Sequence, residues 1–500
     1  MVDLPKLFKL KQWELQKKFE SIKDELDTWE QLTADKQPLQ KHYRQVRRLS
    51  KELTGMIDVV KTEVEKLQRT SDLPSFLLQL RRVEFLILEI HRTWHYFRQK
   101  LAARQGPPFA QLLEALDEFV WACYQPAVLY MKDIPEPPLT FFSSDWSPMA
   151  SSRHELLPLE QTTDLGSEQY SQYAQGGKFN SARLNSLVIP VISMPWFQAT
   201  FLPEALLLAH ETAHLLEYDL DLTANIERNL RTVSIESTRL EKYWLPWSSE
   251  VFADLYAVLH LGPAFVGALS LLLSQSAEAV LRTPDPNNCY PPHHLRMLIA
   301  LTALKAVASR AFEADALRLE KSWNEAYGDS IPGQPCSYEI TDYVLSGCAQ
   351  DIEKVVAALL DGRFDVLGGK SLKEIKGIPW TRKEQDDALL VRDSLLKEDT
   401  RLQGERARIL LAGAQLAFQE RPQALINSGP SRQKTQADLI KRIVSRRTPG
   451  TRGPGDPRPL PPLNAQSDAS DQATGRKRAE AMLAAFDSAQ HSQNDATPKN

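Results

Sequence analysis

The sequence has few cysteines for its length, and this limits the sites that it can build. The four cysteines, Cys123, Cys289, Cys336 and Cys348, are far apart and form no CxxC pair. They are too few to cross-link a chain of 500 residues. A zinc site made of cysteine is therefore disfavoured, so histidine and carboxylate remain as the available metal ligands.

Long hydrophobic runs are also missing. No uninterrupted apolar run approaches the roughly eighteen residues of a membrane-spanning helix. The N-terminal segment alternates charged with apolar residues, whereas a secretory signal peptide has a continuous apolar stretch. We therefore expect a cytoplasmic protein without a membrane segment.

The chain has the composition of an ordinary globular protein, with 42% hydrophobic and 25% charged residues and a net charge of −4. Residues 105–420 carry 26 basic and 42 acidic side chains. This acidic excess argues against nucleic-acid binding there. It is compatible with cationic substrates, and it equally serves solubility.

Residues 1–130 are predicted to form a helical bundle that begins with a coiled-coil-like hairpin. Seven-residue spacing of apolar residues, with two interleaved positions, is typical of a helix packed along another helix. The spaced residues are Phe8, Leu15, Ile22 and Trp29, and the interleaved ones are Phe19 and Leu26. We expect helices over residues 5–32, 38–69, 74–104 and 109–130. A regulatory protein partner could bind this bundle.

The rest of the chain is expected to be mainly helical with a small β element, an α+β fold. Residues 131–185 lack periodicity and are predicted to be a connecting loop. Residues 187–192, LVIPVI, predict a strand, and Pro190 places it at a sheet edge because proline cannot donate to the ladder. A second domain is expected over residues 186–420, with helices over 248–274, 293–327, 342–360 and 401–419. Residues 421–500 are rich in proline, glycine and serine and predict a disordered tail, with a short helix only over 479–489.

The chemistry is predicted by an HExxH motif, His210-Glu211-Thr212-Ala213-His214. Residues four apart lie on one face of a helix, so both histidines can direct a ring nitrogen at one metal ion. Glu211 is rotated by about 100° from His210, beside the position of a metal-bound water that it can deprotonate. The alternative is two chance histidines on a helix, but Leu206, Leu207 and Leu208 predict that this helix is buried in a core.

A catalytic zinc needs a third protein ligand, and Glu250 is the first candidate. It lies in the first turn of the next predicted helix, with Asp254 one turn later on the same face. Two carboxylates on an apolar helix need a partner, and a zinc ion with its histidines is one. Asp254 would then accept the outer N–H of a zinc-bound histidine. Three other acids, Glu217, Asp219 and Asp221, compete for the third place.

With HExxH followed by ExxxD on a second helix, the chain resembles the gluzincin branch of zincin metallopeptidases over about residues 185–300. The resemblance implies a zincin-like core with Zn²⁺ bound by His210, His214 and Glu250, and Glu211 as general base. It implies that Asp254 supports a zinc histidine. The metzincin pattern is absent, because positions 217 and 220 hold glutamate and leucine.

Gluzincins often use a downstream histidine or tyrosine to stabilise the oxyanion, and by resemblance the candidates here are Tyr290, His293 and His294, with His293 the first choice and His294 the second. We therefore expect a zinc metallopeptidase that hydrolyses peptides or proteins through a water activated by Glu211. We further expect extended substrate to pair with the LVIPVI strand. The alternative is a non-catalytic interaction protein that acts through its helical bundle, with a structural zinc site or none.

Overall fold

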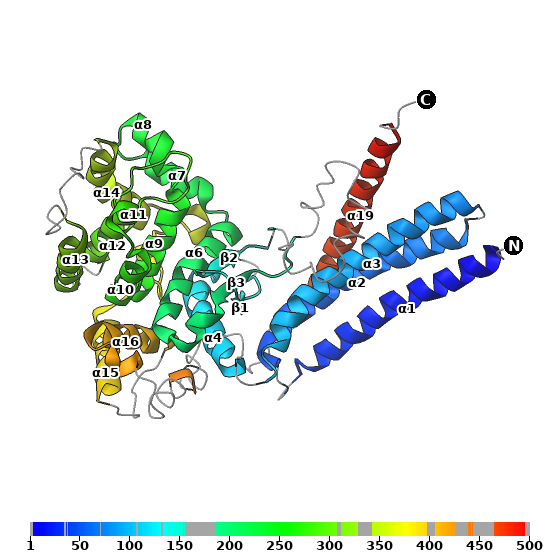
Figure 1. Ribbon diagram of the computed structural model, residues 1–500, viewed down its shortest axis with the longest axis horizontal. Helices are drawn as coiled ribbons and strands as arrows, with labels where there is room; N and C mark the ends of the chain where they lie inside the picture. The colour runs from blue at the N-terminus through cyan, green and yellow to red at the C-terminus, as the bar shows by residue number, and fades with distance from the viewer. Residues whose placement is uncertain are drawn as a thin grey trace. The chain divides into compact units, whose positions relative to one another are not determined.

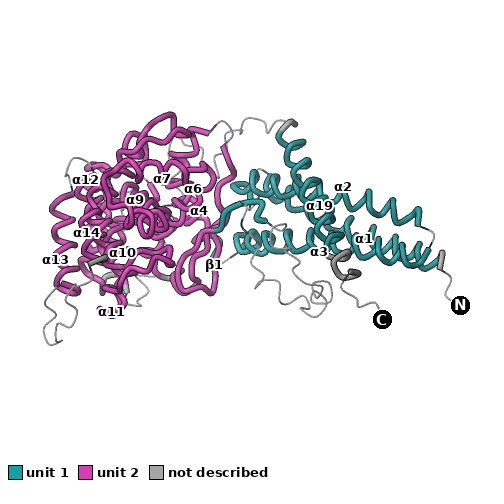
Figure 2. The backbone as a smooth tube through the Cα atoms, turned by 90° about the horizontal axis from the view of Figure 1, so that it is seen from above, with its two compact units in different colours: residues 1–110, 151–190, 454–500 teal, residues 111–150, 191–453 magenta. Residues whose placement is uncertain are grey.

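The computed structural model of the protein divides the chain into two compact units (Figure 2). Unit 1 comprises residues 1–110, 151–190 and 454–500, and unit 2 comprises residues 111–150 and 191–453. The structure describes residues 4–34, 37, 39–70, 72–106, 109–131, 134–153, 155, 186–307, 312–328, 343–397, 406–426, 439–441, 443 and 465–495. None of the described helices is both long enough and apolar enough to cross a bilayer.

The described residues of unit 1 form four long helices (Figure 1). They are α1 (Leu4–Gln31), α2 (Tyr43–Gln68, preceded by the short η1, Gln40–His42), α3 (Leu73–Ala102) and α19 (Ala465–Asp495). The heptad pattern of α1 is confirmed as a packing face, because Leu15, Ile22 and Leu26 are buried. Asp72 caps α3 by accepting a hydrogen bond from the Ser75 backbone N–H at 2.9 Å.

Helix α19 corrects the prediction of a disordered tail. It packs along α2 and buries an apolar stripe that includes Met482, Leu483 and Phe486. Ion pairs also hold it, among them Arg47 with Asp468 at 2.5 Å. The segment is too polar to fold alone, but the face that α2 and α3 present supplies the missing apolar partner. Residues 427–438, 442, 444–464 and 496–500 of the predicted tail lie outside the described residues.

Unit 2 is mainly helical, and its helices pack around one large apolar core. The predicted boundary at residue 130 differs from the structure, because α4 (Ala110–Val128) belongs to unit 2. Its Phe119 and Tyr124 are buried in the unit 2 core, and the Tyr256 hydroxyl donates to the Cys123 carbonyl at 2.7 Å. The remaining helical elements are η4 (Trp196–Thr200), η5 (Leu202–Leu207), α6 (Leu208–Asp219), α7 (Thr223–Arg231), α8 (Ser237–Arg239), η6 (Leu240–Trp244), α9 (Ser248–Leu261), α10 (Pro263–Leu273), α11 (Ala277–Val280), α12 (His293–Ala306), α13 (Glu313–Tyr327), α14 (Tyr343–Asp361), η8 (Asp365–Leu367), η9 (Leu372–Glu374), α15 (Arg382–Leu396), α16 (Ala407–Glu420) and α17 (Gln423–Ile426).

The helix predicted over residues 248–274 is divided into α9 and α10. Gly262 separates them with a φ of 55°, a conformation that side chains other than glycine rarely adopt. A Cβ at Gly262 would lie 2.4 Å from a ring carbon of Trp380, so the glycine also allows close packing. Pro263 then occupies the first turn of α10, where its missing N–H leaves no hydrogen bond unmade.

A three-stranded sheet lies beside α6. It contains β1 (Leu139–Ser143), β2 (Met149–Ser151) and β3 (Val191–Pro195) in the order β1-β3-β2, with β1 parallel to β3. The edge prediction for residues 187–192 is therefore wrong, because β3 is central. It begins after Pro190, so the proline needs no ladder partner. The predicted connecting loop, residues 131–185, contains β1 and the edge strand β2, and its residues 156–185 lie outside the described chain.

Candidate metal and catalytic site

Helix α6 holds both histidines of the HExxH motif on one face. Leu206, Leu207 and Leu208 are buried, as their run in the sequence predicted, so the helix is anchored in the core. The two imidazole rings are 4.8 Å apart between centroids, and their Nε2 atoms are 3.2 Å apart. Two nitrogens bound to one tetrahedral zinc at about 2.05 Å would be about 3.3 Å apart. The pair is thus spaced as zinc ligands are.

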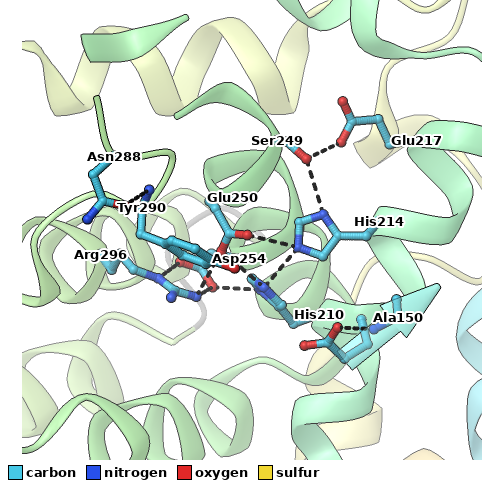
Figure 3. Close-up of polar contacts among 11 residues, drawn as sticks. Ala150, His210, His214, Glu217, Ser249, Glu250, Asp254, Asn288, Tyr290 and Arg296 are labelled. Carbon is cyan, nitrogen blue, oxygen red and sulfur yellow. Dashed lines mark hydrogen bonds and ion pairs between the residues drawn. The ribbon is translucent and has the colours of Figure 1, made fainter. Parts of the chain in front are cut away.

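Glu250, in the first turn of α9, completes a three-residue cluster with these histidines (Figure 3). Its Oε1 lies 3.2 Å from His214 Nε2, and its Oε2 lies 3.4 Å from His210 Nε2. One ligand atom from each residue falls within 4.8 Å of the others. Two imidazoles and one carboxylate are a donor set that suits a catalytic zinc with one open position. The residues that the sequence predicted as metal ligands therefore come together and fit the ion.

Behind His210 lies a buried chain of charges. His210 Nδ1 lies 2.9 Å from Asp254 Oδ1, and Arg296 donates to both oxygens of Asp254 at 2.8 Å. Burial alone would raise the pKa of Asp254, but Arg296 and His210 outweigh it and lower the pKa. Likewise burial lowers the pKa of His210, yet Asp254 and Glu250 raise it to about 10. Asp254 thus fixes the ring so that Nε2 faces the cluster.

Arg296, on α12, has a role that the sequence did not indicate. It pairs bidentately with Asp254 and lies 3.7 Å from Glu250. Its position one turn after the two histidines of α12 was the available signal. A buried arginine on an apolar helix needs an acidic partner, and only the fold reveals which acid that is.

His214 has a different support on its outer side. Its Nδ1 lies 3.1 Å from Ser249 Oγ, and Ser249 in turn donates to Glu217 at 2.5 Å. The other oxygen of Glu217 accepts from the Thr223 hydroxyl at 2.9 Å. Glu217 is therefore not a member of the metal cluster, and it is connected to His214 through Ser249. The other two competing acids, Asp219 and Asp221, are not part of the cluster among the described residues.

Glu211 is directed toward the edge strand β2. Its Oε2 accepts the backbone N–H of Ala150 at 2.8 Å. Burial raises the pKa of Glu211, which increases its strength as a base toward a metal-bound water. The sequence predicted this role for Glu211 but not its contact with β2.

The three oxyanion candidates differ in their placement. His293 Nδ1 lies 3.2 Å from the Leu273 carbonyl, and His294 Nδ1 accepts the indole N–H of Trp323 at 3.2 Å. Tyr290 is 49% exposed and lies beside the metal cluster in Figure 3. The negative charge of Glu250 contributes most to raising the pKa of its hydroxyl. The charge of Glu250 thus couples the Tyr290 hydroxyl to the cluster.

Comparison of the chain with protein-family models, with curated proteins and with solved structures gives no match.

Proposed function

We propose that the protein is a zinc-dependent metallopeptidase of the gluzincin type, with a zincin-like core formed by the sheet, α6 and α9. The observation that carries the proposal is the convergence of His210, His214 and Glu250, with Glu211 close enough to interact electrostatically with all three. A structural zinc site is normally closed by four protein ligands. Three ligands next to a buried carboxylate instead favour hydrolysis.

In this proposal the chain's own residues position the reactants and move the proton. When bound, zinc would polarise the substrate carbonyl and lower the pKa of its water. Glu211 takes the proton of that water and delivers it to the leaving amine. Tyr290 donates to the oxygen on which negative charge develops. Asp254 and Ser249 hold the outer nitrogens of His210 and His214.

The substrate in this proposal is a peptide or protein bound in extended form. The central strand β3 is paired on both sides, so it is not available for the pairing that the sequence suggested. In the proposal the substrate pairs with the edge strand β2 instead. This strand lies beside the site, because the N–H of Ala150 donates to Glu211. A regulatory partner at the helices of unit 1 and a cytoplasmic location belong to the same proposal. The free thiols of Cys123 and Cys289 support that location.

The test is a metal and activity measurement on five forms of the chain: the wild type, the two single histidine variants, the double histidine variant and Glu211→Gln. We expect about one zinc for each chain in the wild type. His210→Ala and His214→Ala should each abolish zinc binding, because two ligands hold the ion poorly. Glu211→Gln should retain zinc and lose hydrolysis of an unfolded substrate such as β-casein. Full zinc content in the double histidine variant would overturn the site. Hydrolysis by zinc-loaded Glu211→Gln equal to wild type would overturn the role of the base. Zinc binding without hydrolysis in the wild type would favour the non-catalytic interaction protein.

A further inference from the structure

Three aromatic side chains at one end of the sheet are exposed, and two of them pair with the ring of the third. Trp146 lies between β1 and β2, and Trp196 and Phe197 directly follow β3. Their exposed fractions are 84%, 61% and 42%. The ring centroids of Trp146 and Phe197 are 5.6 Å apart, and those of Trp196 and Phe197 are 6.4 Å apart. We call these three residues the aromatic platform. Clustered exposed aromatic rings are typical of binding sites, since isolated proteins bury such area.

The aromatic platform is continuous with the strand that contacts Glu211. Met149 begins β2 three residues after Trp146, and its carbonyl accepts a hydrogen bond from Ser193 of β3 at 3.3 Å. The next residue, Ala150, donates its N–H to Glu211. An extended chain advances at most about 3.6 Å per residue, so Trp146 lies within about 14 Å of Ala150 between Cα atoms. Consider a peptide bound along β2 with the bond to be cleaved beside Glu211. A side chain about four residues from that bond can then contact the aromatic platform.

We infer that the aromatic platform is a specificity subsite for an apolar side chain of an extended peptide substrate. The inference rests on the proposed function, because it places that substrate beside Glu211. An unpaired edge strand recognises extended peptide through backbone hydrogen bonds, while adjoining side chains select the residue type. Aromatic rings also stack on nucleic-acid bases, but the acidic excess of residues 105–420, 42 acidic against 26 basic, opposes a polyanion. An apolar peptide side chain can pack on the aromatic rings and brings no negative charge to this acidic part of the chain.

The test measures binding in zinc-loaded Glu211→Gln, which cannot turn the substrate over. The probes are fluorescent ten-residue peptides with a neutral Gly-Ser background, into which Phe or Ser is placed at each position in turn. Anisotropy should show one position, or two neighbouring ones, at which Phe binds about ten- to one-hundred-fold tighter than Ser, as buried aromatic anchors do. Adding Trp146→Ala and Phe197→Ala together should remove that preference. Trp13→Ala is the matched control, because Trp13 is 58% exposed on α1, in unit 1.

The outcomes separate this inference from the proposed function. An equal preference for Phe in the Trp146→Ala, Phe197→Ala variant and in its parent would overturn the subsite. So would a change in oligomeric state, from dimer to monomer, caused by these substitutions, because the rings would then form an interface between copies of the chain. If the wild type fails to hydrolyse peptides while the platform-dependent preference persists, the proposed function fails and the binding surface remains. If hydrolysis occurs and its kcat/KM for Phe and Ser peptides is unchanged by the substitutions, only the subsite is wrong.

Discussion

Ser249 donates a hydrogen bond to Glu217 at 2.5 Å while its own oxygen faces the outer nitrogen of His214 at 3.1 Å. One hydroxyl thus connects a predicted zinc ligand on α6 with a carboxylate one turn further along the same helix. Glu217 is the acid that the sequence placed in competition with Glu250. Its position behind His214 explains why a buried glutamate follows the motif without binding the metal.

Removing this hydroxyl should weaken metal binding. With Ser249→Ala, the N–H of His214 loses its acceptor and the ring loses its fixed orientation. We expect zinc affinity to fall about 10- to 100-fold, as is typical when the outer partner of a metal-bound histidine is lost. Competition with a chromophoric chelator measures the affinity, and the visible spectrum of the cobalt-substituted protein reports the ligand geometry. Ser270→Ala, on α10, is the control. Wild-type affinity together with an unchanged cobalt spectrum would mean that the serine does not position His214.

The ion pair between Arg296 and Asp254 should be needed for stability. Arg296→Met leaves the buried carboxylate of Asp254 without its bidentate partner. Breaking one half of a buried pair costs about 3–5 kcal/mol, so the free energy of unfolding in urea should fall by that order. Arg228→Met is the matched control, because Arg228 and its partner Asp365 are exposed and should contribute little. Equal effects of the two substitutions would contradict the buried network.

Tyr290 is expected to act in turnover without holding the metal. In the proposed mechanism Tyr290→Phe removes the donor to the developing oxyanion, so kcat should fall about 10²- to 10³-fold while zinc content and KM stay near wild type. His293→Ala and His294→Ala should change kcat little, because these rings are engaged with Leu273 and Trp323. If either histidine variant shows the large loss and Tyr290→Phe does not, the assignment is reversed.

The metal cluster could be predicted from sequence because its geometry is local to two helices. The i, i+4 spacing of His210 and His214 places both on one face of the helix. A carboxylate in the first turn of the apolar helix α9 needs a charged or metal partner when it is buried. Arg296 and Ser249 could not be predicted, since their roles depend on how α12 and α9 pack against α6. No periodicity in their own segments encodes that packing.

The fold was predictable to a similar extent. Heptad spacing gave α1 correctly, because that pattern is repeated over the whole helix. Helix α19 could not be predicted, because its composition is that of an unfolded segment and its stability comes from α2, more than 400 positions earlier. The order of the strands also depends on non-local pairing, which placed β2 and not β3 at the edge.

The packing of α19 on α2 can be tested at Gly475. A Cβ at this position would lie 1.9 Å from the backbone oxygen of Glu52, so alanine forces the helices apart. In an isolated helix the same change would stabilise by about 1 kcal/mol. We therefore expect Gly475→Ala to lower the thermal stability of unit 1, against the direction of helix propensity. Gly106→Ala is the control, because a Cβ there meets nothing within 4 Å. A higher melting temperature for Gly475→Ala would show that the helices are not in contact at this point.

The buried imidazole of His260 should make unit 2 sensitive to acid. His260 is fully buried on α9, and Arg408 Nη1 lies 3.3 Å from its Nδ1. Burial first, and the positive charge of Arg408 second, lower its pKa well below the usual value. Above the unfolded pKa of about 6.5 the ring is neutral in both states and the shift has no effect. Below it the unfolded chain binds a proton that the folded chain does not, so the free energy of unfolding decreases as pH falls.

Each pH unit below about 6.5 should cost about 1.4 kcal/mol until the folded pKa is reached, which amounts to about 2 kcal/mol at pH 5. His260→Gln offers a comparable acceptor to Arg408 but cannot be protonated. Urea denaturation of both forms at pH 7.5 and pH 5 should therefore show that the free energy of unfolding decreases less in the variant between these two pH values. Comparing the two forms cancels the other titrating groups, including His210, whose raised pKa acts in the opposite direction. If the variant and the wild type lose the same free energy between the two pH values, then His260 is protonated in the folded protein, and the buried neutral imidazole is ruled out.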